Sequence, residues 1–533
     1  METMKGIVIT GTHSGCGKTT VTLGILAALK KKGLKVQSFK TGPDFIDGGL
    51  HKLITGRTAR NLDLWMCGED YVRDCFQKFS EDADVSVVEG VMGLYDGKFS
   101  TAHLASALNL PVLLVVDAYG MAESAGAVVK GFVQYRDSCP SSVSVPGKIN
   151  SFQITDNGHG SRVIGVIFNR VASENHFKRL KDSVLDLPVL GYLPRDLDFE
   201  IPHRHLGLTI AEEGPITAEN INKLSDTVLK YVDVDEIVRK CKSGEVGKRG
   251  STEEQRLLPD FPTSQLPRFP TSALKIAVAY DKAFCFYYED NLDLLKAAGG
   301  QVLLFSPLTD KKIPDGADAI YIGGGYPELY AKQLSENKSM LESVRSWADE
   351  GKPVYAECGG FMYLTEGIYD FGDVFYPMAG AFPLKTKMTK GRAKLGYREV
   401  TLKHDSILGA KGASLRGHEF HYSEIVNSGE AGKRGSTEVT SELTGLCASA
   451  LFYSLKDGSG KILPDEGYQV KNTLGSYIHI HFGSNNSAIA KNFIQFIKVC
   501  FKECHSRKQS ASGILPGKDS GQAGMTGLTN KLY

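Results

Sequence analysis

The chain has 533 residues, too many for one hydrophobic core, so two domains of roughly 200 residues each with extra segments are expected. Its 62 basic and 61 acidic residues give a formal net charge of +1, without the basic excess typical of proteins that bind nucleic acid or membrane surfaces. The 10 cysteines do not form paired Cys-x-x-Cys units, and no apolar run approaches a membrane span. We therefore expect a cytoplasmic protein with no nucleic-acid or membrane partner.

Residues 1–240 alternate short β-rich runs with helical stretches. The predicted helix at 19–32 directly follows the first predicted strand. Several strands are apolar at successive positions, as strands buried on both faces of a parallel sheet are. The pattern predicts a doubly wound α/β domain. Strands are expected at 6–10, 35–39, 85–89, 112–116, 163–168 and 189–192.

A glycine-rich segment, GTHSGCGKTT at 11–20, lies between the first strand and the helix. Such a P-loop wraps backbone N–H groups around a phosphate at a helix N-terminus. Lys18 would reach the β- and γ-phosphates, and the Thr19 hydroxyl would ligate Mg²⁺. The spacing between Gly11 and Gly17 is one residue longer than usual, a known variant. The predicted ATP-binding residues are Gly11, Thr12, Ser14, Gly15, Gly17, Lys18, Thr19 and Thr20.

Magnesium also needs carboxylate ligands. Glu89 ends an apolar strand, which places its carboxylate at the carboxyl edge of the sheet. Asp44 and Asp47 lie in the loop after the second strand. Each acid alone is more typical of a helix cap or turn, but beside a P-loop we expect Thr19, Asp44, Asp47 and Glu89 to bind the metal.

Polar, glycine-rich segments interrupt the two predicted domains. Residues 241–272 are expected to be a linker, and 504–533 a disordered tail. The segment SGEVGKRGSTE at 243–253 returns as SGEAGKRGSTE at 428–438. Neither copy has an apolar face, so both are interpreted as inserted surface loops, and 139–160 as a further insertion.

Residues 273–503 form a second α/β series. Strands are predicted at 275–279, 301–305, 319–322, 353–356 and 476–481. Cys358 follows one of them and precedes Gly359, Gly360 and a helix. This nucleophile-elbow pattern predicts an exposed thiol at a helix N-terminus, with its pKa lowered towards thiolate.

A cysteine nucleophile needs a base and an oxyanion hole. His479 and His481 lie on one predicted strand and either could reach Cys358. Three glycines at 323–325 end another strand, and their N–H groups could stabilise a tetrahedral intermediate. The predicted oxyanion-hole residues are Gly324, Gly325 and Gly359.

Taken in order, these motifs resemble the cobyrinic acid a,c-diamide synthase family, which joins a dethiobiotin-synthetase-like ATPase domain to a class I glutamine amidotransferase domain. The likeness is carried by GTHSGCGKTT (11–20), FKTGPDFID (39–47), NLDLWM (61–66), VEGVMGLYDG (88–97), GGGYPE (323–328), AECGGFMYL (356–364) and SYIHIHF (476–482). It implies a P-loop domain followed by a flavodoxin-like amidotransferase domain.

The resemblance implies that Cys358 is the glutaminase nucleophile and that His479 increases its nucleophilicity. It implies ATP and Mg²⁺ at the first site, and a tetrapyrrole carboxylate as substrate. Ammonia cut from L-glutamine would amidate the a and c side-chain carboxylates of cobyrinic acid after phosphorylation by ATP. A homodimer is compatible with this reading. The residues matched to the substrate are Lys40, His51, Asn61 and Asp63.

Two alternatives stay open. The same motifs serve related amidases that act on nickel-sirohydrochlorin or hydrogenobyrinic acid. A nucleotide switch of the partitioning-ATPase kind would use the P-loop, but would not need a paired cysteine and histidine.

Overall fold

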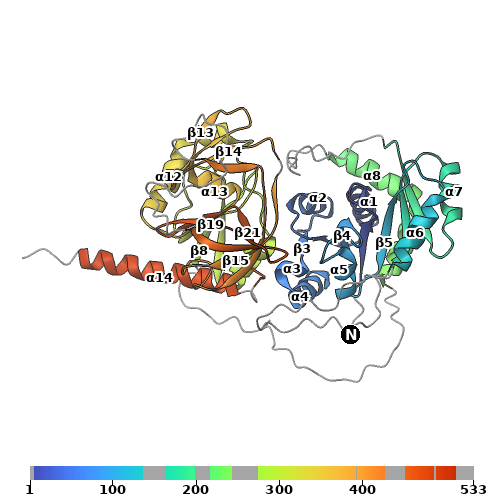
Figure 1. Cartoon of the computed structure of the whole chain (residues 1–533), viewed down its shortest axis with the longest axis horizontal. Helices are drawn as coiled ribbons and strands as arrows, with labels where there is room; N and C mark the ends of the chain where they lie inside the picture. Colours follow the sequence, from blue (N-terminus) through green and yellow to red (C-terminus); the bar gives the residue numbers. More distant parts are fainter. Residues whose placement is uncertain are drawn as a thin grey trace, which may run out of the picture.

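The computed structural model describes residues 5–135, 163–197, 216–242, 274–391, 393–426, 451–484 and 488–511, with side chains described up to residue 501. Two α/β units lie side by side, each built on its own large sheet (Figure 1). The repeated segments at 243–253 and 428–438 and the insertion at 139–160 lie outside the described residues.

The first unit is a seven-stranded parallel sheet in the order β3-β2-β4-β1-β5-β6-β7. Every strand predicted here is present, and the fold prediction is confirmed. The additional strand, β3, is three residues long and carries no periodic signal. The strands are β1 (Gly6–Gly11), β2 (Val36–Thr41), β3 (Arg60–Leu62), β4 (Val85–Gly93), β5 (Val112–Asp117), β6 (Val163–Val171) and β7 (Val189–Pro194).

Helices cover both faces of this sheet, which is why its strands are apolar throughout. One core includes Leu26, Leu224 and Ile237 from α1, α8 and α9, and the other includes Phe76 and Leu104 from α4 and α5. The helices are α1 (Lys18–Lys31), α2 (Phe45–Thr55), α3 (Leu64–Cys67), α4 (Glu69–Ser80), α5 (Thr101–Ala107), α6 (Ser124–Gln134), α7 (Glu174–Ser183), α8 (Ala218–Tyr231) and α9 (Val234–Lys242).

The second unit contains a ten-stranded mixed sheet, ordered β21-β16-β15-β18-β19-β20-β11-β10-β8-β9. The last five strands are parallel, and β16, β15, β18 and β19 are antiparallel. Four of the five parallel strands, β8, β9, β10 and β11, are those that the sequence predicted. The predicted strand at 476–481 corresponds mainly to β21, which pairs antiparallel with β16, and it shares only Ser476 with β20. The strands are β8 (Leu274–Ala279), β9 (Gly300–Phe305), β10 (Ala319–Ile322), β11 (Val354–Glu357), β15 (Lys394–Leu402), β16 (Ser414–His421), β18 (Leu451–Asp457), β19 (Ile462–Val470), β20 (Thr473–Ser476) and β21 (Ile478–Ile480).

A four-stranded sheet and further helices complete this unit. The small sheet has the order β13-β12-β14-β17. Its strands are β12 (Thr365–Tyr369), β13 (Phe375–Pro377), β14 (Phe382–Met388) and β17 (Ser423–Val426). The helices are α10 (Glu289–Ala297), α11 (Ala331–Glu336), α12 (Lys338–Asp349), α13 (Gly359–Leu364) and α14 (Ala488–Ala511).

Two predicted boundaries are wrong by several residues. The tail was expected to begin at 504, but α14 continues to Ala511. The linker was expected to begin at 241, but Cys241 is buried in the first core near the end of α9. In both cases a helix continues past the point where the composition becomes polar. Within the described segments, no helix combines the length and apolarity required to cross a membrane.

Candidate active sites

The glycine-rich loop joins β1 to α1, and its glycines are required by the backbone. Gly17 caps α1 with φ of 91°. A Cβ there would lie 1.9 Å from the Asn169 Nδ2 atom, which donates a hydrogen bond to the Cys16 carbonyl at 3.0 Å. Asn169 lies near the end of β6, so this strand supports the loop. The resulting turn brings the loop to a helix N-terminus, an arrangement suited to an anion.

The other predicted loop residues surround this turn. Lys18 Nζ donates to the His13 carbonyl at 3.0 Å, and burial lowers the pKa of Lys18. Ser14 and Gly15 are exposed, whereas Gly11 is buried at the end of β1, and Thr12 and Thr20 are half-buried. The middle of the loop is therefore accessible to a ligand, whereas its first residue is buried in the sheet.

Glu89 is the centre of the polar cluster next to the loop. Its fully buried carboxylate accepts hydrogen bonds from the Thr19 hydroxyl at 2.7 Å and from Lys40 Nζ at 3.0 Å. His51 Nε2 lies 2.7 Å from its second oxygen. Burial is the strongest single influence and acts to raise the pKa of Glu89, but Lys40 and His51 together lower it below its ordinary value. Glu89 is therefore an anion held by three partners.

Lys40 is a buried cation between three carboxylates. Its Nζ lies 2.7 Å from Asp47 and 3.9 Å from Asp44, in addition to its contact with Glu89. Burial acts to lower the pKa of Lys40, but Glu89 and Asp47 raise it above its ordinary value. Lys40 consequently stays protonated beside the loop, within a cluster that also carries the negative charges of its carboxylate partners.

Asp44 combines the cap role and the charge role that the sequence left open. Its Oδ1 caps α2 by accepting from the backbone N–H groups of Ile46 (3.0 Å) and Asp47 (3.1 Å). Its Oδ2 is the atom facing Lys40. The Asn61 side chain supports the same loop by donating to the carbonyls of Gly42 and Asp44.

Asp63 lies apart from the Glu89 cluster and faces the second unit. It is buried, caps α3 through the Met66 N–H at 2.8 Å, and accepts from the Tyr397 hydroxyl at 2.7 Å. Burial raises the pKa of Asp63. Asp63 therefore caps a helix of its own unit and forms a hydrogen bond to the other unit.

The touching oxygens of Thr19 and Glu89 suit Mg²⁺, which prefers oxygen ligands and few carboxylates. Within the described residues, no group of three or more His, Cys, Asp or Glu side chains is arranged to hold a metal. Asp44 and Asp47 instead face Lys40, so their role as metal ligands stays a prediction.

Cys358 occupies a sharp turn between β11 and α13. Its backbone has φ of 48° and ψ of −107°, a strained conformation for a residue with a side chain. The prediction of an exposed thiol with a lowered pKa is wrong. Cys358 is only 5% exposed, and burial, reinforced by the carboxyl of Glu328, raises the pKa of its thiol.

The glycines predicted to form an oxyanion hole are not equivalent. Gly324 exchanges backbone hydrogen bonds with Phe286, donating at 3.1 Å and accepting at 3.0 Å. A Cβ on Gly359 would lie 3.0 Å from the Gly325 nitrogen. Since the Gly324 N–H is already engaged, the geometry favours Gly325 and Gly359 as donors.

The three glycines at 323–325 form a turn, called the glycine turn below. His479, and not His481, contacts it. A Cβ on Gly324 would lie 2.2 Å from His479 Cε1. His479 stacks on His418 with ring centroids 4.8 Å apart, and burial lowers the pKa of His479 to about 3. It is a neutral imidazole at physiological pH. His481 instead packs on Tyr288, with its Nε2 3.8 Å from Asp290.

Sequence reasoning missed a set of polar contacts made by side chains of β16. Tyr288 shares a 2.6 Å hydrogen bond with His418 Nδ1. Glu419 lies 2.8 Å from His421 Nε2 and 2.6 Å from Arg398 Nε. The motif GHEFHY at 417–422 contains three of these residues, and its density of histidine and glutamate was the available signal.

The two units meet across a partly buried polar interface. Arg60, at the start of β3, pairs with Asp290 at 3.0 Å and with Asp293 at 2.7 Å. Arg416 donates to the Trp65 carbonyl at 2.8 Å. Because the Arg60 pairs are buried or nearly so, they fix the relative position of the units more firmly than surface pairs would.

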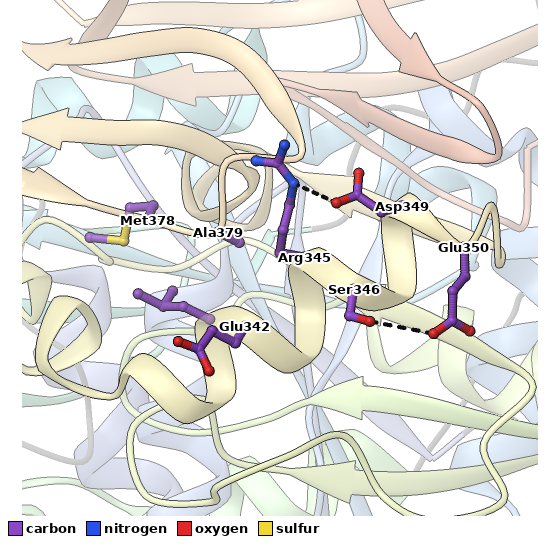
Figure 2. A pocket seen from close by; sticks show the side chains of 8 residues that line it. Glu342, Arg345, Ser346, Asp349, Glu350, Met378 and Ala379 are labelled. Atoms are coloured by element: carbon purple, nitrogen blue, oxygen red, sulfur yellow. Dashed lines mark hydrogen bonds and ion pairs between the residues drawn. The ribbon is translucent and has the colours of Figure 1, made fainter.

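A hollow away from both sites lies beside α12 (Figure 2). It is an open depression of about 520 Å³, and Arg345 within it pairs with Asp349 at 2.9 Å. A second, smaller cavity of about 10 Å³ has walls that include Gly42, Asp63 and Tyr397, with room for one water-sized molecule. This second cavity lies between the two units.

Sequence comparisons identify both parts of the chain. Residues 7–208 match the family described as the CobQ/CobB/MinD/ParA nucleotide binding domain, and residues 275–487 match the CobB/CobQ-like glutamine amidotransferase domain. A cobyrinate a,c-diamide synthase of Listeria monocytogenes is 41% identical over 92% of this chain and 99% of its own. The chain belongs to the cobyrinate a,c-diamide synthase family.

Other members and solved structures are similar to the chain. The Priestia megaterium family member is 38% identical over 93% of this chain and 98% of its own. The structure of PurLQS from Thermotoga maritima covers 43% of this chain and all of its own, at 12% identity and a TM-score of 0.28. The family assignment rests on the sequence relatives.

Proposed function

We propose that the protein amidates the a and c side-chain carboxylates of cobyrinic acid, using ATP and glutamine. The observation that carries the proposal is the pairing of two complementary sites in one chain of this family. One site joins a P-loop to the Glu89–Lys40 cluster. The other has Cys358 at a sharp strand–helix turn, with Gly359 packed against Gly325 and His479 packed against Gly324.

The proposed mechanism of glutamine cleavage starts from a neutral Cys358 thiol and a neutral His479 imidazole. A thiol whose pKa is raised by burial needs a base as it attacks. In the proposed step His479 takes the Cys358 proton while Sγ bonds to the side-chain amide carbon of glutamine. The N–H groups of Gly325 and Gly359 stabilise the oxyanion. Return of the proton releases ammonia, and water then hydrolyses the thioester to glutamate.

The synthetase half makes the substrate carboxylate reactive. A carboxylate oxygen attacks the γ-phosphorus of ATP, and ADP leaves. Lys18 and Lys40 supply positive charge near the transferred group. Ammonia attacks the acyl carbon, loses a proton and expels phosphate, giving the amide. Thr19 and Glu89 would hold Mg²⁺, which neutralises phosphate charge when bound. Asp44, Asp47, His51, Asn61 and Asp63 stay predicted as metal- or substrate-site residues.

The organisation of the chain is part of the proposal. Residues 1–240 would form the synthetase domain and 273–503 the amidotransferase domain, subject to the helix extensions described above. A homodimer and a cytoplasmic location stay predictions.

The test is a mass measurement on cobyrinic acid, with nickel-sirohydrochlorin and hydrogenobyrinic acid run in parallel. Each amidation replaces OH by NH₂ and lowers the mass by about 1 unit. The two steps can therefore be resolved. Two ATP- and glutamine-dependent steps on cobyrinic acid would support the proposal. Turnover of another macrocycle alone would transfer the activity to that substrate.

A further inference from the structure

Helix α2 touches both candidate sites. Its capping residue Asp44, together with Asp47 and His51 on the helix itself, faces the Lys40–Glu89 cluster of the synthetase site. Its first residue, Phe45, faces the amidotransferase unit. Figure 1 shows α2 on the side of its unit turned towards β21. Any rearrangement of the cluster by ligands therefore acts on the helix that carries Phe45.

Phe45 makes its ring contacts with elements of the glutaminase site. Its ring centroid lies 5.2 Å from that of His479 and 5.5 Å from that of His418. It also stacks on Phe286 at 5.3 Å and packs on Tyr288 at 4.9 Å. Phe286 is the residue whose backbone pairs with Gly324. One synthetase-domain ring thus contacts both the histidine and the segment that holds the glycine turn.

The surroundings of His479 explain why this ring matters. The imidazole is 2% exposed, and within the described structure its Nδ1 has no hydrogen-bond partner. In many enzymes a hydrogen bond orients the catalytic histidine. The orientation of His479 depends instead on packing against His418, Gly324 and Phe45. Of these three contacts, only Phe45 belongs to the other domain.

We propose that Phe45 is a positioning residue that couples the two sites, holding His479 against the glycine turn and linking that orientation to the Lys40-centred acidic cluster. This inference rests on the proposed function of the two sites. In this role Phe45 takes no part in bond making. Its ring holds the imidazole of His479. Its backbone lies in the first turn of α2, which is capped by Asp44, and Asp44 in turn faces Lys40.

The test compares Phe45→Ala with wild type in three assays of the full-length chain. These are glutamine-dependent amidation of cobyrinic acid, amidation with ammonium chloride, and glutamate release with and without MgATP. We expect glutamine-dependent amidation to fall about tenfold, since a misplacement of about 1 Å can cost on the order of 10²-fold in rate. Ammonia-dependent amidation should stay within about twofold, because it does not use His479. Glutamate released per amide should rise, and the effect of MgATP on glutamate release should diminish.

Two further variants separate coupling from folding. Phe45→Leu keeps an apolar side chain against His479 and should recover part of the coupling. Leu53→Ala truncates a 48% exposed residue of the same helix and should behave as wild type. Equal loss of glutamine- and ammonia-dependent amidation in Phe45→Ala would assign the ring a merely structural role. Unchanged coupling would also overturn the proposal.

The MgATP comparison keeps this test independent of the macrocycle. If wild type amidates none of the macrocycles, the proposed function fails, but glutamate release can still be measured with and without MgATP. A wild-type response to MgATP that Phe45→Ala lacks would support the coupling even then. The same response in both proteins would contradict it.

Discussion

Charge states of single residues determine how the glutaminase site can operate. Burial keeps the Cys358 thiol protonated and the His479 imidazole neutral. Both groups begin the reaction uncharged, and charge develops only as the proton moves. The backbone N–H groups at the glycine turn therefore have to stabilise the oxyanion that forms at the same time.

The pH dependence of glutaminase activity follows from this arrangement. The pKa of His479 in the fold is about 3, below its ordinary value of about 6.5, so the imidazole stays unprotonated until the solution is far more acidic. We expect kcat/KM for glutamine to change by less than about twofold between pH 8 and pH 6 on account of this histidine. A fall with a midpoint near 6.5 would contradict the neutral buried base.

Gly17 gives a second residue-scale prediction. Gly17→Ala adds a Cβ at φ of 91° and places it 1.9 Å from Asn169 Nδ2. Strained backbone of this kind costs about 1–3 kcal/mol, and the clash would displace the loop. We expect a KM for ATP raised at least about tenfold, because a 1.4 kcal/mol loss of binding is a factor of ten.

Gly33 supplies the matched control for this substitution. It also has positive φ, 81°, but a Cβ there would meet nothing within 4 Å. Gly33→Ala should reduce stability through backbone strain alone and leave the KM for ATP unchanged. Equal KM values in the two variants would show that the loop tolerates the side chain.

Among the elements, strand β3 contributes to the contact between the two units as well as to its own sheet. It is a three-residue edge strand, and its first residue, Arg60, forms the buried pairs with α10. Losing one partner of a buried pair leaves an uncompensated charge. The interface consequently depends on both partners being present.

A double-mutant cycle tests this pairing. We expect Arg60→Met to lower the free energy of unfolding by about 3–5 kcal/mol, since Asp290 would stay buried without its partner. Arg60→Met combined with Asp290→Asn should cost less than the sum of the two single changes. Chemical denaturation of the four proteins measures the coupling. Additive changes would show that the pair does not hold the interface.

The elements that the sequence predicted share a local signal. Apolar runs such as 85–89 and 112–116 identify buried parallel strands, and the glycine-rich loop and the Cys358 turn have local motifs. The antiparallel strands β15, β16, β18 and β19 were missed because long polar segments such as KLGYREVTL do not form an apolar run. The Arg60–Asp290 pair is 230 residues apart in sequence and has no local signature.

The same limit applies to the sites. Cys358 and Lys18 could be selected from their motifs, but Phe45 reads as an ordinary apolar residue between two aspartates. Its contacts with His418 and His479 exist only once the two units meet. The raised pKa of Cys358 likewise depends on burial by residues distant in the chain.

For the whole molecule, the essential feature is that a glutaminase and a synthetase share one interface. Ammonia made at Cys358 is useful only if an activated carboxylate is ready at the other site. The buried pairs of Arg60, the Asp63–Tyr397 hydrogen bond and the ring of Phe45 all cross this interface. The units are therefore expected to act together.

The most direct measurement is the stoichiometry of ADP, glutamate and amide during turnover of cobyrinic acid. We predict one ADP and one glutamate for each amide formed. Cys358→Ser should lose glutamine-dependent turnover while keeping ammonia-dependent turnover at one ADP per amide, and Cys500→Ser, on α14, should match wild type. ADP or glutamate formation that does not follow amide formation in wild type, or a Cys358→Ser protein that still uses glutamine, would contradict the account.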